Sequence, residues 1–240
     1  MTPNKHVLAI SHPTFGHMIP LMELCKRLAD SGIQITFAIS EVRAIEIQKR
    51  GILPLQYADK ILIHSLKDGV THDLEASIGP AHHPNLIAKV LPVLTDFIEK
   101  IAENSGNVLQ CQLPVNAIVY DMMMVTPAKV CKRVGLPCYA FFPNGLYMLG
   151  MLGFPEIDQL MTPGTDEDFF LPPPENGYPK MSPSFASHIK GMRESMSLVN
   201  GILVNSSRDM EGAEVAGMLT ACPVFQETPY RAVGPLLQVI

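Results

Sequence analysis

The sequence lacks tryptophan, and it also lacks several patterns that mark common classes of protein. No Gly-x-Gly-x-x-Gly motif follows the first apolar run, so a nicotinamide oxidoreductase is poorly supported. The five cysteines are odd in number and form no Cys-x-x-Cys motif, which indicates free thiols in a reducing compartment. The net charge is -5 and no basic run is interleaved with aromatic residues, so we expect no nucleic-acid partner.

Long apolar runs are absent as well. The longest, such as residues 148–154, fall far short of the roughly 20 residues that a membrane-spanning helix needs. The opening MTPNKHVLAIS has one early lysine and then a strand-like run, unlike a secretory signal peptide. We therefore expect a cytoplasmic protein without a membrane span. With 240 residues and a hydrophobic fraction of 47%, residues 1–240 are expected to form one domain with a sizeable core.

Short apolar runs rich in β-formers alternate with stretches of helical periodicity along the chain. This alternation predicts parallel strands joined by right-handed helical crossovers, a doubly wound, Rossmann-like α/β sheet with helices on both faces. Pro92 is expected to kink or split one helix, and the proline-dense residues 155–183 to form a loop excursion. The expected strands are 7–10, 33–39, 60–66, 115–121, 138–142, 201–205 and 230–237; the expected helices are 18–30, 41–50, 84–103, 126–134, 145–154, 184–198 and 209–219.

Two side chains that can do acid–base chemistry follow buried strands of this predicted sheet. His17 lies in a loop that holds Pro13, Gly16 and Pro20, between the first strand and the first helix. Asp121 ends another apolar strand. The carboxyl ends of parallel strands share one rim, and a histidine held by a carboxylate is an oriented general base. The alternative from spacing alone is that both residues only cap local structure.

Other polar clusters favour solvated loops. His64, His72, His82 and His83 match no metal-binding spacing, and the acidic run 166–168 does not resemble a calcium loop. The 14 methionines can fill an irregular core or line an adaptable apolar pocket. We expect no metal site.

The segment HPTFGHMIPLMELCKRL resembles the opening loop and helix of plant-type family 1 UDP-glycosyltransferases. The segments IVYDMMMVTPAKVCKRVGLP, FFPNG, GILVNSSRDMEG and AVGPLL resemble later blocks of that family, in the same order. The resemblance implies the N-terminal acceptor domain of a GT-B fold. It also implies that His17 deprotonates the acceptor and that Asp121 orients His17.

The same resemblance suggests which residues surround a flat lipophilic acceptor. Phe15 stands where many members carry a glutamine or a small residue, so the pocket is expected to differ in shape there. Core packing is the alternative for each of the methionines. The expected acceptor-binding residues are Phe15, Gly16, Met122, Met148, Phe185, Ile189 and Met192.

The family's donor-binding signature, an aromatic-rich segment with His-Cys-Gly-Trp, is absent from these residues. We therefore expect no tightly bound cofactor, and a UDP-sugar co-substrate only together with a donor domain. A donor domain or a second copy of the chain is an expected partner. Two functions stay open. The first is the acceptor half of an inverting UDP-glycosyltransferase for a small lipophilic alcohol or phenol, inactive alone. The second is a stand-alone protein that binds a small lipophilic ligand.

Overall fold

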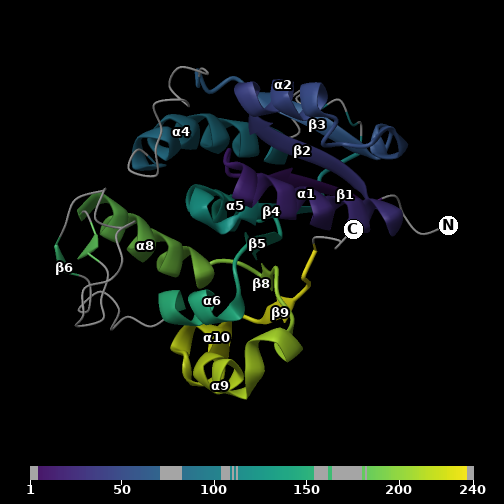
Figure 1. Ribbon diagram of the computed structural model, residues 1–240. Helices are drawn as coiled ribbons and strands as arrows, with labels where there is room; N and C mark the ends of the chain where they lie inside the picture. Colours follow the sequence, from purple (N-terminus) through teal and green to yellow (C-terminus); the bar gives the residue numbers. More distant parts are fainter. Residues whose placement is uncertain are drawn as a thin grey trace.

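The computed structural model describes residues 5–70, 83–103, 109, 111, 113–153, 162–163, 180–181 and 183–236. Seven parallel strands form its main sheet, in the order β3-β2-β1-β4-β5-β8-β9 (Figure 1). The order reverses between β1 and β4, which makes this boundary the topological switch point of the sheet. The strands are β1 His6–Ile10, β2 Gln34–Ser40, β3 Ile61–Leu66, β4 Ala117–Asp121, β5 Cys138–Phe142, β8 Gly201–Val204 and β9 Tyr230–Ala232.

Helices cover both faces of the sheet, as the alternating sequence pattern predicts. Helices α1 and α2 pack on one face, and α4, α5, α6, α8 and α9 belong to the other. In Figure 1, α6, α9 and α10 gather at the end of the molecule opposite α2. The helices are α1 Phe15–Asp30, α2 Glu41–Arg50, α4 His83–Ala102, α5 Thr126–Val134, α6 Leu146–Gly153, α8 Pro183–Met196, α9 Arg208–Ala221 and α10 Pro223–Glu227, with short 3-10 helices η1 Leu55–Tyr57 and η3 Met122–Met124.

Local sequence sets several of the helix ends. Gly51 after α2 and Gly135 after α5 adopt left-handed backbone conformations, with φ of 61° and 76°. Glycine reaches this conformation without steric cost, so it ends a helix readily. Helix α2 also has Glu41 in its first turn and basic residues in its last, which complements the helix dipole.

Three details differ from the sequence-based expectation. Helix α1 begins at Phe15, so Gly16 and Pro20 lie inside the helix rather than in a loop. Pro20 is the sixth residue of α1, and as a proline it lacks the N–H group that would otherwise bond to the carbonyl of Gly16. Pro92 lies inside α4 without splitting it. Within 155–183, residues 162–163 and 180–181 pair as the short parallel strands β6 and β7; most other residues of that range lie outside the described residues.

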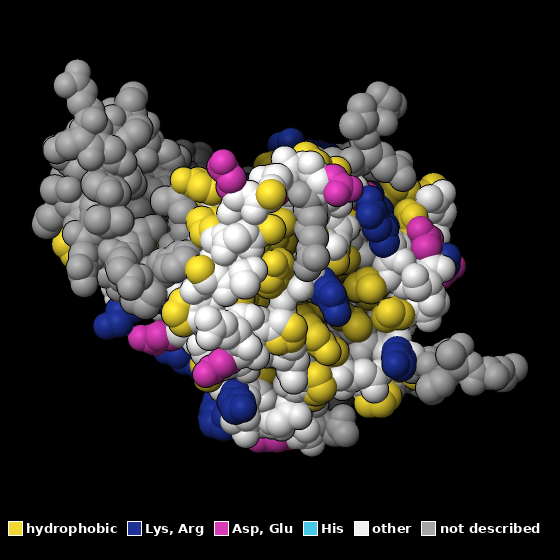
Figure 2. Space-filling view, turned by 90° about the horizontal axis from the view of Figure 1, so that it is seen from below, with side chains coloured by type: hydrophobic (Ala, Val, Ile, Leu, Met, Phe, Trp, Pro, Cys, Tyr) yellow, Lys and Arg dark blue, Asp and Glu magenta, His cyan; other side chains and the backbone are white. Residues whose placement is uncertain are grey.

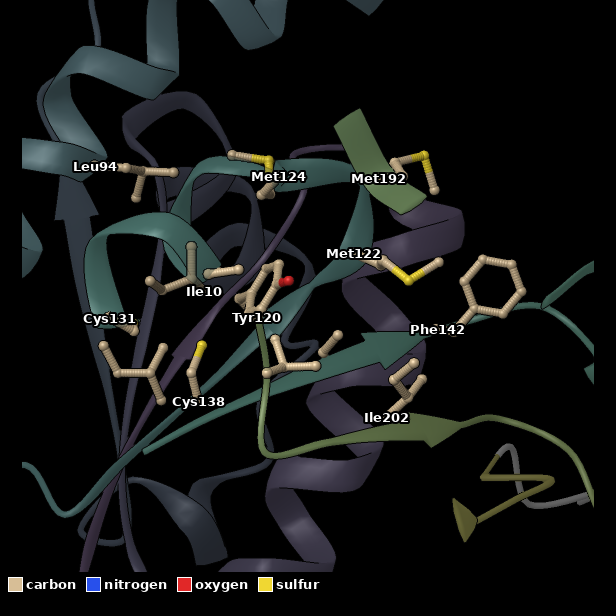
Figure 3. Packing of buried hydrophobic residues seen from close by; sticks show 14 of the residues in the cluster. Ile10, Leu94, Tyr120, Met122, Met124, Cys131, Cys138, Phe142, Met192 and Ile202 are labelled. Carbon is tan, nitrogen blue, oxygen red and sulfur yellow. The ribbon is translucent and has the colours of Figure 1, made fainter. Parts of the chain in front are cut away.

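Two apolar clusters fill the faces of the sheet. Alternate residues of a strand point to opposite faces, so Leu8 and Ile10 join the larger cluster while Ala9 joins the smaller one. Figure 3 shows Met122 and Met124 beside Tyr120 in the larger cluster, with Met192 of α8 close by. Methionine therefore does fill the core at these positions.

The segment that follows β9 crosses back to α1. Arg27 of α1 donates to the carbonyl groups of Val233, Pro235 and Leu236 at 3.2–3.5 Å. Leu236 is fully buried in the smaller cluster. Residues 233–236 therefore tie the edge of the sheet to the helix that carries His17, instead of continuing β9 as the sequence pattern suggested.

The surface carries some large hydrophobic side chains. Tyr147 and Met148 on α6 are 55% and 42% exposed, and Met210 on α9 is 68% exposed. Figure 2, which views the molecule from the side of α9, shows hydrophobic side chains between scattered charged ones. Among the described residues no helix is long and apolar enough to cross a membrane.

Candidate active site

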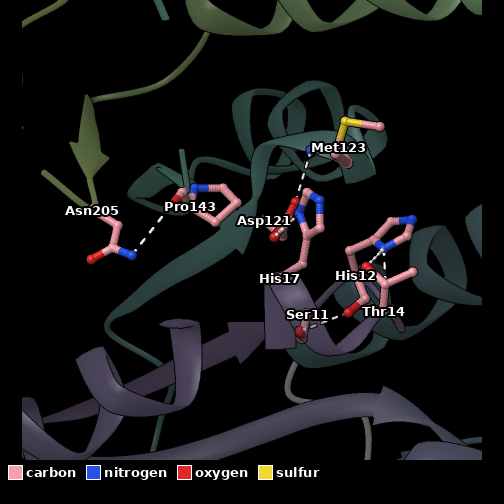
Figure 4. A network of polar contacts seen from close by, with 8 residues as sticks. All are labelled: Ser11, His12, Thr14, His17, Asp121, Met123, Pro143 and Asn205. Atoms are coloured by element: carbon pink, nitrogen blue, oxygen red, sulfur yellow. Dashed lines mark hydrogen bonds and ion pairs between the residues drawn. The ribbon is translucent and has the colours of Figure 1, made fainter. Parts of the chain in front are cut away.

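His17 and Asp121 meet at the switch point of the sheet. Nδ1 of His17 lies 2.8 Å from Oδ2 of Asp121, although the two residues are 104 positions apart. The side chain of Asp121 is fully buried, whereas that of His17 is 20% exposed. Figure 4 shows the ring of His17 beside the carboxylate of Asp121 at the end of β4. The carboxylate is thus inaccessible, whereas part of the His17 side chain remains accessible.

The backbone fixes the carboxylate of Asp121 from the opposite side. Its second oxygen, Oδ1, accepts a hydrogen bond of 3.0 Å from the N–H of Met123 (Figure 4). Asp121 thereby caps η3, the 3-10 turn that follows β4 directly. One oxygen is held by the turn and the other is left for His17, which defines the plane of the carboxylate and the direction of the ring.

The electrostatics of the pair favour a protonated ring. Burial alone would lower the pKa of His17, because a charged imidazolium loses hydration. The negative charge of Asp121 and its hydrogen bond outweigh this effect, so the pKa of His17 lies above its usual value. A base whose pKa is raised in this way holds an abstracted proton more firmly.

The loop between β1 and α1 supports His17 through a second histidine. His12 is fully buried, and its ring centroid lies 5.0 Å from that of His17. Nδ1 of His12 lies 3.0 Å from the hydroxyl oxygen of Thr14 and accepts a longer bond from the N–H of Thr14, 3.3 Å. Ser11 donates to the carbonyl of His12 at 2.9 Å. These contacts fix the loop that leads into the first turn of α1, where His17 lies.

The ring of Phe15 packs toward α2. The guanidinium groups of Arg43 and Arg50 lie 4.2 Å and 4.8 Å from the centroid of its ring, within the range of a cation–π contact. Arg43 also donates from Nε to the carbonyl of Pro13 at 2.6 Å and pairs with Glu46. Phe15 therefore anchors the start of α1 to α2.

The other residues expected to bind an acceptor fall into different environments. Met122, Ile189 and Met192 are at most 5% exposed and share the larger apolar cluster. Met148 is exposed on α6. Gly16 is exposed, and a Cβ atom built on it would meet nothing within 4 Å. The side chain of Phe185, and also His72 and His82, lie outside the described part of the chain.

One contact between an acidic side chain and a helix N-terminus near this rim was not expected from the sequence. Glu211 of α9 accepts from the N–H groups of Leu146 and Tyr147, at 2.7 and 3.2 Å, and from the hydroxyl of Ser206 at 2.6 Å. Burial would raise the pKa of Glu211, but these donors outweigh it and hold the pKa below its usual value. The N-terminus of α6 is therefore capped by a side chain 65 residues away. The sequence signal, an acid shortly after the strand Gly201–Val204, does not reveal this partner.

Residues 5–238 match the family model for the glycosyltransferase N-terminal domain. The chain belongs to this family. Among curated relatives, UDP-glucosyltransferase 74AE2 of Panax ginseng is 24% identical over 266 residues, covering 99% of this chain and 51% of the relative. The sequence-based resemblance to plant UDP-glycosyltransferases is thereby confirmed. The chain spans about half the length of the curated relatives that it matches across most of its residues.

Solved structures of plant enzymes share the fold of this glycosyltransferase domain. UGT2 of Phytolacca americana, complexed with UDP-2fluoro-glucose and pterostilbene, superposes with a TM-score of 0.69 at 18% identity over 100% of this chain and 56% of that chain. UGT71G1 of Medicago truncatula, complexed with UDP-glucose, gives 0.67 at 20% identity over 98% and 52%. The predicted fold, the N-terminal half of a GT-B fold, is confirmed.

Proposed function

We propose that this glycosyltransferase domain binds a small lipophilic alcohol or phenol and activates its hydroxyl group for transfer of a sugar from a UDP-sugar. The observation that carries the proposal is the His17–Asp121 hydrogen bond at the switch point of the sheet. Nδ1 of His17 donates to Asp121, which leaves the lone pair of Nε2 for an acceptor hydroxyl. The substrate class is supported by structurally similar plant proteins, one complexed with UDP-2fluoro-glucose and pterostilbene and another with UDP-glucose.

On the acceptor side, the proposed reaction needs only the side chains of His17 and Asp121. Nε2 of His17 takes the proton of the acceptor hydroxyl while its oxygen attacks the anomeric carbon of the sugar. The bond from that carbon to the diphosphate breaks, and UDP leaves with the electron pair. The configuration at the anomeric carbon inverts because attack and departure occur on opposite faces. The carboxylate of Asp121 stabilises the imidazolium that forms, and general base catalysis of this kind contributes about 10²–10⁴-fold.

The contacts to the UDP-sugar are proposed to come from a donor domain, which must hold the anomeric carbon in line with the acceptor oxygen. The exposed Tyr147, Met148 and Met210 offer apolar surface for such a domain, or for a second copy of this chain. We expect the chain by itself to bind acceptors and to transfer sugar very slowly. The alternative function is that of a ligand-binding protein. Such a protein would bind the same small lipophilic compounds but would show no sugar transfer even when joined to a donor domain.

The test measures binding and turnover separately. A panel of phenols and terpenoid alcohols is titrated into the chain by calorimetry, with and without UDP, and we expect binding that UDP does not change. The same chain followed by the donor domain of a plant relative is then assayed with UDP-glucose. We expect turnover that His17→Ala lowers at least 10²-fold and that Lys129→Ala, an exposed control, leaves unchanged. Turnover insensitive to His17→Ala would refute the proposal, and binding without any turnover would favour the alternative.

A further inference from the structure

A second histidine contacts the turn that holds Asp121. His188 lies on α8, which packs against η3, and its ring N–H donates to the backbone carbonyl of Met123. The backbone N–H of the same Met123 donates to Oδ1 of Asp121. The backbone of Met123 thus links His188 to Asp121.

The surroundings of this contact are apolar and largely buried. Ile189 and Met192, one and four residues after His188, are buried against Met122 and Met124, the residues on either side of Met123. Closely packed interiors do not deform continuously, so α8 and η3 are expected to move as one body. Helix α8 therefore contacts the turn that lies directly after Asp121.

From this chain of contacts we propose that His188 is a positioning residue for the base His17. Through the carbonyl of Met123, His188 sets the turn whose N–H fixes Oδ1 of Asp121, and this in turn aims Oδ2 at Nδ1 of His17. His188 touches neither acceptor nor sugar in this scheme. A catalytic role for His188 rests on the proposed function. The alignment of His17 with Asp121 does not, and it can be measured without substrate.

Burial keeps the ring of His188 in its neutral form, since its pKa is lowered by loss of hydration. A neutral ring still has one N–H to donate, so the contact with Met123 does not require a charge. An amide side chain can supply the same donor. A leucine of similar volume cannot, which provides a pair of variants that separate hydrogen bonding from packing.

The experiment follows the titration of the His17 ring by NMR in the 240-residue chain, with no substrate and no turnover. In the wild type we expect a pKa above the usual 6.5. In His188→Leu we expect it to fall by roughly half a pH unit as the alignment with Asp121 loosens, and in His188→Asn to return toward the wild-type value. His64→Leu is the matched control, because it removes another partly buried histidine, stacked on Phe97, without touching η3.

The outcomes separate this inference from the proposed function. A wild-type pKa of His17 that is not raised would refute the pair itself, and with it the proposed function. A raised pKa that is identical in wild type, His188→Leu and His188→Asn, in folded proteins, would overturn only the role of His188. An equal fall in His64→Leu would show that the effect is nonspecific and would overturn it as well.

A second measurement decides the matter should His188→Leu not fold. In the labelled wild-type chain, a scalar coupling between a ring nitrogen of His188 and the carbonyl carbon of Met123 arises only across a hydrogen bond. We expect this coupling and a slowly exchanging amide at Met123. Absence of the coupling would overturn the proposal without any variant.

Discussion

The ring of His17 and the carboxylate of Asp121 are joined across the boundary at which the strand order of the sheet reverses, between β1 and β4. His17 belongs to the first turn of the helix after β1, and Asp121 is the last residue of β4. Parallel strands bring both to one rim, where the side chain of His17 is partly exposed and that of Asp121 is buried. This relationship can be tested without knowing the acceptor.

The first prediction concerns the charge of Asp121. In Asp121→Asn, burial of the ring persists while the negative charge disappears, so we expect the pKa of His17 to fall to 6.5 or below. NMR titration of the ring measures this change. Asp96→Asn is the control, since Asp96 is 63% exposed and pairs with Lys100 on the same helix. An unchanged pKa in Asp121→Asn would mean that the carboxylate does not act on the ring.

The same pair makes stability depend on pH in a defined direction. Because the folded pKa of His17 is raised, its contribution to the free energy of unfolding is fully present below 6.5 and is lost as the pH rises through the folded pKa. We expect Asp121→Asn to cost about 1–3 kcal/mol at pH 6 and less at pH 9. Urea denaturation at both values measures the difference; a cost that grows with pH would contradict the assignment.

At this site the sequence predicts the His17–Asp121 pair but not the turn η3 that holds Asp121. His17 and Asp121 could be placed on one rim because each directly follows a buried strand, and strand ends of a parallel sheet converge. The turn η3 had no periodic signal in Met122–Met124. Its role depends on tertiary contacts with α8, which no local pattern encodes. The cap on α6 by Glu211 was missed for the same reason.

A second pH effect, of opposite sign, comes from His6. Its Nδ1 donates to the carbonyl of Leu113 and its Nε2 accepts from the hydroxyl of Thr36, both at 2.9 Å, and burial lowers its pKa. The neutral ring satisfies both partners, whereas a protonated ring would lose its acceptor. Its contribution to stability is therefore present above 6.5 and is lost as the pH falls through the folded pKa.

We expect the free energy of unfolding to fall between pH 7 and pH 5, and this fall to be smaller in His6→Gln, whose side chain does not titrate. Burial also lowers the pKa values of His64 and His188, so these residues contribute to the fall in the same direction. Denaturation curves of both proteins across this range test the point. Equal falls in the two proteins would show that His6 is not a source of the acid sensitivity.

The cap on α6 gives a prediction about an acidic residue. Glu211→Gln keeps the size of the side chain but removes the charge that accepts from two backbone N–H groups and Ser206. We expect a loss of about 1–2 kcal/mol at pH 7. Because the folded pKa of Glu211 is lowered, this loss should shrink as the pH falls below 4.5. The control is Glu214→Gln, an exposed acid of the same helix, and an equal loss there would argue against a capping role.

The last prediction tests the segment that returns from β9 to α1. A Cβ atom at Gly234 would lie 2.5 Å from Oδ1 of Asn205, 2.7 Å from its carbonyl carbon and 2.8 Å from the backbone nitrogen of Ser206. Two of these atoms belong to the backbone, which cannot turn aside as a side chain does, so Gly234→Ala is expected to destabilise the fold by about 1–3 kcal/mol. Gly217→Ala is the matched control in α9, where a Cβ meets nothing within 4 Å, and higher helix propensity should raise stability by up to about 1 kcal/mol. Thermal unfolding of both variants gives opposite signs if residues 233–236 are packed as described. Stability unchanged in Gly234→Ala would show that this segment does not lie against Asn205, and that Arg27 does not hold it there.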